Sequence, residues 1–539
     1  MTTFGPLLRQ RVRRDRWQLA LWVAGTGIMA AFSTSAIAQS YGDDRSRRAI
    51  MLLATENPSI LMLRGLPAGY GFGAFTFFEI YAFLALLAGL MSTFLAVRHT
   101  RAEEESGRAD LVTATPAGRT VPLVATLAHG LLANVVLGLV VALGFLSAGL
   151  PVTGSFVAGA AVAAAGLAFL GLGLVCAQFL RTSRGANGAA AALVVLAYLL
   201  RGLGDSLSRP GADELHRVAA WPSWLSPIGW GQQTGAWTGN ALWPLLLSLC
   251  FTGACGAGVL VLQERRDTGA SLLPSRRGRD RARPALGSPS ALAWRLQWPT
   301  ILGWCVGGAA TGLLAGSLTH LVDQVSDADE NVVDTLRSMV PGTTQTLTQL
   351  LIAAMFGVAG VLAAACAVQV VLRLRQEESA GTAEVLLATP VDRTRWLLDY
   401  VVLGVVAVVL VMAATAVAAA LALLGSGEDV ARVGDAFVAG LAQLPAALLY
   451  LGVLALGFVF LPGVVIGLGW GLLALGVALG TFGGMVGAPQ WLRDLSPFTH
   501  TPVPGAGVAS WTGGLWMLAL AVAATALAAS GMRRRQLRP

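Results

Sequence analysis

Long apolar stretches recur along the whole chain, and they constrain its fold more than any other feature. Twelve of them reach or approach the roughly 20 residues that an α-helix needs to cross a bilayer. Hydrophobic residues make up 55% of the 539 residues and charged residues only 12%, about half the usual charged share of a soluble domain. The sequence therefore predicts an all-α polytopic membrane protein. A β-barrel would show short alternating strands instead.

The predicted spans form two groups of six. The first group lies at residues 17–39, 72–98, 121–149, 154–180, 186–204 and 241–263, and the second at 299–320, 346–372, 397–424, 434–460, 463–486 and 511–532. Because six is even, both groups cross the membrane in the same orientation, related by an axis along the membrane normal. We expect a first six-helix repeat over residues 1–270, an Arg- and Pro-rich cytoplasmic linker over 271–288 and a second six-helix repeat over 289–539.

The basic residues indicate the orientation of the chain. All 37 are Arg, and if the N-terminus is cytoplasmic most of them lie in cytoplasmic segments, as the positive-inside rule requires. We therefore expect a multi-pass protein of the bacterial cytoplasmic membrane, with both termini in the cytoplasm. The Arg-rich stretch 275–284 is better explained as a topogenic linker than as a nucleic-acid site.

The absence of Lys restricts the chemistry. A Walker A loop needs its Lys to reach the nucleotide phosphates, so any ATP hydrolysis must occur on a partner protein. The five Cys residues lie in apolar stretches without metal-ligand spacing, and the five His residues are scattered. We expect His129 to pack within its span, and we expect no enzymatic activity, cofactor or metal in this chain.

Two charged segments between the second and third span of each group are the best-matched part of the duplication. "RAEEESGRADLVTATPAGRT" (residues 101–120, the first charged segment) and "RQEESAGTAEVLLATPVDRT" (residues 375–394, the second charged segment) align at an offset of 274 without a gap. Ten of the twenty positions are identical. An unconstrained loop would not be better matched than the spans around it, so we interpret both segments as sockets for another protein.

The expected local structure is a helical extension of the second span, a turn at Gly107 and a short helix ending before Pro116. This arrangement presents the acidic side chains to the cytoplasm, with Leu111 and Val112 as apolar anchors. The candidate docking residues are Glu103, Glu104, Glu105, Asp110, Thr115, Pro116 and Arg119 in the first charged segment and Glu377, Glu378, Glu384, Thr389, Pro390 and Arg393 in the second.

Two further pairs of segments repeat in the same order. "LLRQRVRRDRWQLALW" (7–22) is answered by "SALAWRLQWPTILGW" (290–304), and "WPSWLSP" (221–227) by "WLRDLSP" (491–497). Residues 7–18 are amphipathic and suit a helix lying flat on the inner membrane surface. Because Pro227 and Pro497 interrupt helices, we expect short helices that dip back into the membrane there.

With these motifs, the chain resembles the permease subunits of type-2 ABC exporters, most closely the long fused permeases of the tetronasin type. The resemblance implies an elbow helix before the first span, coupling helices in the charged segments and a central cavity lined mainly by spans two and five of each half. It implies an external gate at Trp224, Ser226, Pro227, Ser496 and Pro497. It also implies two copies of a separate ABC ATPase subunit, which carry ATP and Mg, and an amphipathic or hydrophobic small-molecule cargo such as an antibiotic, drug or lipid moved out of the cell.

Glu79 is the one acid predicted deep within a span. An intramembrane acid suggests a site for a cationic cargo or a proton. The alternative is a carboxyl group near the external end that is hydrogen-bonded to a neighbouring helix. Phe75, Phe78 and Tyr81 are candidate cavity residues beside it, although packing is the commoner role of such aromatics.

Three other classes of protein remain as alternatives. A proton-coupled secondary transporter with two six-helix halves would need charges in several spans. A non-transporting scaffold or sensor that binds an ATPase is poorly excluded by sequence. "GLGD" (202–205) matches the GxGD pattern of intramembrane aspartyl proteases, but no second well-placed Asp accompanies it, and we expect Asp205 to cap a helix end.

Overall fold

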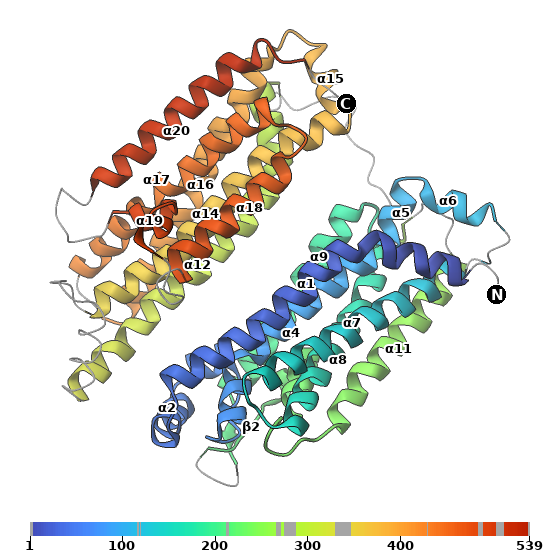
Figure 1. Ribbon diagram of the computed structural model, residues 1–539, viewed down its shortest axis with the longest axis vertical. Helices are drawn as coiled ribbons and strands as arrows, with labels where there is room; N and C mark the ends of the chain where they lie inside the picture. Colours follow the sequence, from blue (N-terminus) through green and yellow to red (C-terminus); the bar gives the residue numbers. More distant parts are fainter. Residues whose placement is uncertain are drawn as a thin grey trace. The chain divides into compact units, whose positions relative to one another are not determined.

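A computed structural model of the chain describes residues 4–115, 118, 120–211, 215–265, 271–273, 287–328, 347–427, 430–482, 489–502 and 511–536 (Figure 1). Nearly all of these residues are helical. The one sheet among them is an antiparallel pair, β1 (Arg209–Pro210) and β2 (Arg217–Val218). The chain divides into two compact units, Met1–Arg277 and Gly278–Pro539. The predicted all-α polytopic fold is confirmed.

The first unit contains six long apolar helices. They are α1 (Phe4–Ser40), α4 (Phe72–Arg98), α7 (Val121–Ser147), α8 (Val152–Phe179), α9 (Ser183–Ser206) and α11 (Trp243–Glu264). Two shorter helices, α2 (Asp44–Glu56) and α3 (Pro58–Arg64), connect α1 to α4. Helices α4 and α8 are the most enclosed, and the core of this unit forms around them.

The second unit contains five long apolar helices and one shorter one. The long helices are α12 (Pro289–Ala328), α14 (Leu347–Ser379), α16 (Arg393–Gly425), α17 (Val430–Phe460) and α20 (Trp511–Met532). The shorter one, α18 (Val465–Val477), continues into a π-helical turn, η3 (Ala478–Phe482).

The number of spans differs from the prediction at one place. Eleven helices in the described part of the chain are long and apolar enough to cross a membrane, rather than twelve. The exception is the predicted span 463–486, where the described helical stretch is shorter and the last residues lie outside the described ranges. Its sequence holds Gly at 463, 467, 469, 471, 476 and 480, and Gly weakens a helix because it loses the most backbone freedom on folding.

Close backbone approach through Gly holds α7 against α8. A Cβ atom added at Gly159 would lie 2.3 Å from the carbonyl oxygen of Gly138, and one added at Gly138 would lie 2.7 Å from that of Gly159. Small residues serve this purpose in membrane helices, where packing replaces the hydrophobic drive between helices.

The variant Gly159→Ala tests this packing. The added methyl group overpacks the contact, which costs about 1–3 kcal/mol, so we expect a lower thermal unfolding midpoint for the purified chain in detergent. Gly188→Ala in α9 is the matched control, because a Cβ atom there meets nothing within 4 Å. Equal midpoints for the two variants would contradict the packing assigned to α7 and α8.

Candidate functional site

The two charged segments have the same backbone geometry. In the first, α4 is followed by α5 (Arg101–Glu105), a turn at Gly107 and α6 (Arg108–Thr113). In the second, α14 continues to Ser379, and a turn at Gly381 leads into α15 (Thr382–Leu387). Both Gly residues have φ = 71°, a left-handed conformation that Gly adopts without strain. The predicted order of helical extension, turn and short helix is confirmed.

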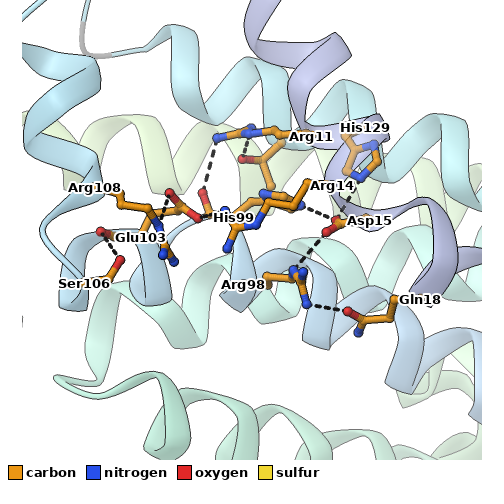
Figure 2. Close-up of polar contacts among 11 residues, drawn as sticks. Arg11, Arg14, Asp15, Gln18, Arg98, His99, Glu103, Ser106, Arg108 and His129 are labelled. Carbon is orange, nitrogen blue, oxygen red and sulfur yellow. Dashed lines mark hydrogen bonds and ion pairs between the residues drawn. The ribbon is translucent and has the colours of Figure 1, made fainter. Parts of the chain in front are cut away.

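Two acids of the first charged segment, Glu103 and Glu104, do not point outward as predicted, whereas Glu105 and Asp110 are exposed. Glu103 forms ion pairs with Arg14 of α1 and with Arg108, at 3.2 Å from the Arg108 Nε atom (Figure 2). Glu104 pairs with Arg101 at 2.8 Å. Glu105 accepts a hydrogen bond from the backbone N–H of Ser183 at 2.8 Å.

The corresponding acids of the second charged segment are buried. Glu377 is 7% exposed and accepts hydrogen bonds from the Tyr400 hydroxyl at 2.6 Å and the Trp396 indole N–H at 3.3 Å. Glu378 is 3% exposed, and Arg535 Nη2 lies 2.7 Å from both of its carboxylate oxygens. A buried charge at the end of a helix bundle is strongly stabilised by a partner within the same protein. Glu377 and Glu378 therefore anchor the second charged segment to its own unit.

The exposed side of each segment carries an acid followed by an aliphatic residue. Leu111 is 72% exposed and Val385 is 74% exposed. Asp110 and Glu384, the preceding residues, are also exposed. The two pairs occupy equivalent positions at the offset of 274. Each unit therefore exposes an aliphatic side chain with an acid beside it.

The remaining candidate docking residues follow the short helices in the sequence. Thr115 and Thr389 donate hydrogen bonds to Val112 and Leu386 carbonyl oxygens at 2.6 and 2.5 Å. Arg393 donates to the Arg535 carbonyl oxygen at 2.6 Å, and Pro390 is exposed. Pro116 and Arg119 lie outside the described residues.

A buried polar cluster that the sequence analysis did not predict lies beside Glu103 of the first charged segment (Figure 2). Asp15 Oδ2 is 2.5 Å from His99 Nε2 and 3.2 Å from His129 Nε2, and Asp15 Oδ1 is 2.9 Å from Arg98 Nε. Arg11 donates to the Pro122 carbonyl and the Thr126 hydroxyl at 2.8 and 2.7 Å. Residues 7–18 therefore do not form a separate amphipathic surface helix, because they belong to α1 and bury Arg11 and Asp15.

The only signal in the sequence for this cluster is the spacing of Arg11 and Asp15. Residues four apart share one face of a helix. His129 is buried within its span, as expected, but it also contacts the carboxylate of Asp15.

Short helices occur at both "LSP" motifs. η1 (Trp221–Leu225) and α10 (Pro227–Gln232) flank Ser226, and η4 (Pro497–His500) follows Ser496. Both Ser hydroxyls are buried and accept a backbone N–H at the start of the following helix. The Trp224 ring stacks on Trp243 with centroids 5.8 Å apart.

The candidate cavity residues lie in the core of the first unit. Phe75, Phe78 and Tyr81 are buried among its helices, and the Tyr81 hydroxyl donates to the Ile228 carbonyl oxygen of α10 at 3.0 Å. They therefore pack α4 and do not line an open cavity within this unit, because large aromatic side chains gain most from full burial.

Glu79 has a charged partner outside the spans. It lies in the second turn of α4 and forms an ion pair with Arg64 at the end of α3. Burial lowers the pKa of the Arg64 guanidinium below its ordinary value. The structure agrees with the alternative reading of Glu79, a carboxyl group near the helix end held by a neighbouring element.

A second buried ion pair lies in α9. Arg201 and Asp205 are four residues apart and 3.0 Å from each other. Arg201 also donates to the Met62 and Leu63 carbonyl oxygens of α3 at 2.8 and 3.1 Å. Asp205 therefore serves a buried contact between α9 and α3, and it does not cap the helix end as the sequence suggested.

Comparison with known proteins gives two matches. The chain is 36% identical over 542 residues, covering 99% of this chain and 95% of the relative, to a protein of Mycobacterium tuberculosis described as multidrug efflux system permease protein Rv1217c. A family model described as the C-terminal domain of multidrug efflux system permease Rv1217c matches residues 286–533. With near-complete coverage at this identity, and with its bundle of long apolar helices, the chain belongs to the family of multidrug efflux system permeases that includes Rv1217c.

Proposed function

We propose that this chain is the membrane-spanning subunit of an ATP-driven exporter of the ABC type, similar to the fused tetronasin-type permeases. A separate pair of ABC ATPase subunits, carrying ATP and Mg, would bind the two charged segments from the cytoplasm. The cargo would be an amphipathic or hydrophobic small molecule moved out of the cell. Family membership supports the efflux role, and the absence of Lys supports a separate source of power.

The observation that carries this proposal is the twofold repetition of one docking geometry. Each charged segment turns at a Gly with the same φ and exposes an aliphatic side chain beside an acid, Leu111 with Asp110 and Val385 with Glu384. A single exposed aliphatic side chain is common on protein surfaces, so the proposal is supported by its repetition, next to an acid, at the equivalent position of the second segment. A solvated loop has no physical reason to repeat this pattern.

The internal contacts of the paired acids explain how a movement of the exposed residues would be transmitted to the spans. Glu103 fixes α5 to α1. Glu104 pairs with Arg101 of α5, which also donates to the Ala177 carbonyl oxygen of α8 at 2.9 Å. In the second unit, Glu377 and Glu378 fix the end of α14. A segment held by internal ion pairs moves together with the helix that carries it. We propose that each charged segment acts as a rigid extension of its span, which suits it to transmit a conformational change.

A proton-coupled carrier is the less favoured alternative. Such a carrier needs an ionisable group within the membrane that is available to the proton. Glu79 and Asp205 are each paired with an Arg. Pairing of this kind favours a structural role for both acids.

The double variant Leu111→Asp and Val385→Asp tests the docking surface. Both side chains are largely exposed, so the chain should fold normally, while a charge in an apolar contact should weaken ATPase binding at least about tenfold. Binding would be measured by co-purification with a co-expressed candidate ABC ATPase subunit.

Val218→Asp in β2 is the matched control, since Val218 is 60% exposed and lies outside both charged segments. We expect it to bind the ATPase like the unaltered chain. Full ATPase binding by the double variant would contradict the docking surface, and cargo transport by the purified chain alone in vesicles would contradict the whole proposal.

The orientation has its own test. Leu111→Cys would be introduced into a chain whose five native Cys residues are replaced by Ser. Because the charged segments are proposed to face the cytoplasm, a membrane-impermeant maleimide should label this Cys in inverted membrane vesicles and leave it unlabelled in intact cells. Labelling in intact cells would place the segment outside and reverse the topology.

A further inference from the structure

The buried cluster of Asp15, His99 and His129 joins three helices at one carboxylate. Asp15 belongs to α1 and His129 to α7, while His99 is the residue that ends α4. All three side chains are almost fully buried. Two residues after His99 the first charged segment begins. Asp15 therefore contacts the chain at the end of α4, two residues before the first charged segment begins.

The cluster is costly to separate. One carboxylate oxygen of Asp15 contacts the imidazole nitrogens of His99 and His129, and the other contacts the guanidinium group of Arg98. A carboxylate that stays buried after losing its partners has neither water nor ion pairs to stabilise its charge, so separating the cluster costs free energy. The end of α4, the first turns of α1 and the start of α7 must therefore move together, or else exchange these contacts in one step.

The described residues of the second unit form no equivalent cluster. At the offset of 274, His99 corresponds to Arg373 and His129 to Leu403, and residues 289–322 at the start of α12 contain no acid. Arg373 instead pairs with Glu377 at 3.4 Å. Within the part of the chain that the structure describes, the link through a buried carboxylate of the first span is therefore particular to the first unit.

A metal ion is a poor occupant of this cluster. Asp15 Oδ2 and the two imidazole nitrogens lie within 4.8 Å of one another and offer two nitrogens and one oxygen, a donor set that suits zinc. However, Arg98 contacts the same carboxylate and Arg11 donates to the His99 carbonyl oxygen at 3.3 Å. A divalent cation would add two charges where two guanidinium groups already lie, in a place with little water to screen the repulsion.

We propose that Asp15 is a positioning residue that fixes the first charged segment to α1 and α7, so that movement of this segment reaches the first and third spans. The inference rests on the proposed function, because it assigns Asp15 a part in transmitting the movement of a bound ATPase. It makes the two halves mechanically unequal. The first charged segment acts on three helices through one carboxylate, and the second acts through contacts of a different kind.

The variant Asp15→Asn keeps the size of the side chain and removes its charge. On the purified full chain alone, we expect hydrogen exchange of backbone amides in residues 99–113 to accelerate about tenfold, with unchanged exchange in the equivalent residues 373–387. In vesicles with the ATPase bound, we expect the amount of cargo moved per ATP hydrolysed to fall about fivefold or more, the scale of a typical coupling energy. Asp15→Glu should restore part of both losses.

Asp43→Asn is the matched control, because Asp43 is an exposed cap of α2 and Asn caps helices equally well. If Asp15→Asn does not fold, His129→Gln removes only the longest of the three contacts and should give the same changes at smaller size. Unchanged exchange in residues 99–113 would overturn the inference. So would faster exchange with normal transport per ATP, or zinc at one equivalent per chain after purification without added metal.

The failure of this inference differs from the failure of the proposed function. If the unaltered chain binds no ATPase and moves no cargo with ATP, the proposed function fails, and the transmitting role of Asp15 fails with it. The exchange measurement still decides whether Asp15 positions the first charged segment. If the unaltered complex is active and Asp15→Asn retains full transport per ATP, only the inference fails.

Discussion

A charge buried in a membrane bundle must find its partner within the same chain, and this constraint shapes every polar feature described above. Water is not available to solvate it, and the cost of an unpaired buried ion is several kcal/mol. Accordingly Arg201 meets Asp205, Glu378 meets Arg535 and Asp15 meets Arg98. The pairs of Glu378 and Asp15 join different segments of the chain, whereas Arg201 and Asp205 pair within α9, and Arg201 reaches α3 through the Met62 and Leu63 carbonyl oxygens.

The same constraint gives the residues of each charged segment two different roles. The carboxylates before the Gly turn contact groups of their own unit, and the short helix after the turn exposes an aliphatic side chain. The two units reach this result with different partners. Glu103 depends on α1, whereas Glu378 depends on Arg535, which also lies 4.3 Å from the Phe458 ring of α17. Similar backbones are thus held by unrelated side chains, as expected when duplicated halves diverge around a retained shape.

Much of the fold was predictable because the bilayer imposes a length on each span. The turns at Gly107 and Gly381 were predictable because the two copies agree there. The direction of Glu103 and Glu377 was not, because their partners, Arg14 and Tyr400, are fixed by tertiary packing. The cluster at Asp15 was missed for the same reason, since His99 and His129 are 84 and 114 residues away in sequence. The described stretch at α18 is rich in Gly, which weakens a helix in a way that a hydropathy count does not register.

The ion pair between Glu378 and Arg535 has a consequence for biogenesis. Glu378 leaves the ribosome 157 residues before Arg535, so α16, α17 and α20 must all be synthesised before this ion pair can form. Until then Arg375, three residues earlier, is the local ion-pair partner of the carboxylate. The contact that ties the end of α14 to the chain beyond α20 is therefore among the last to form during synthesis.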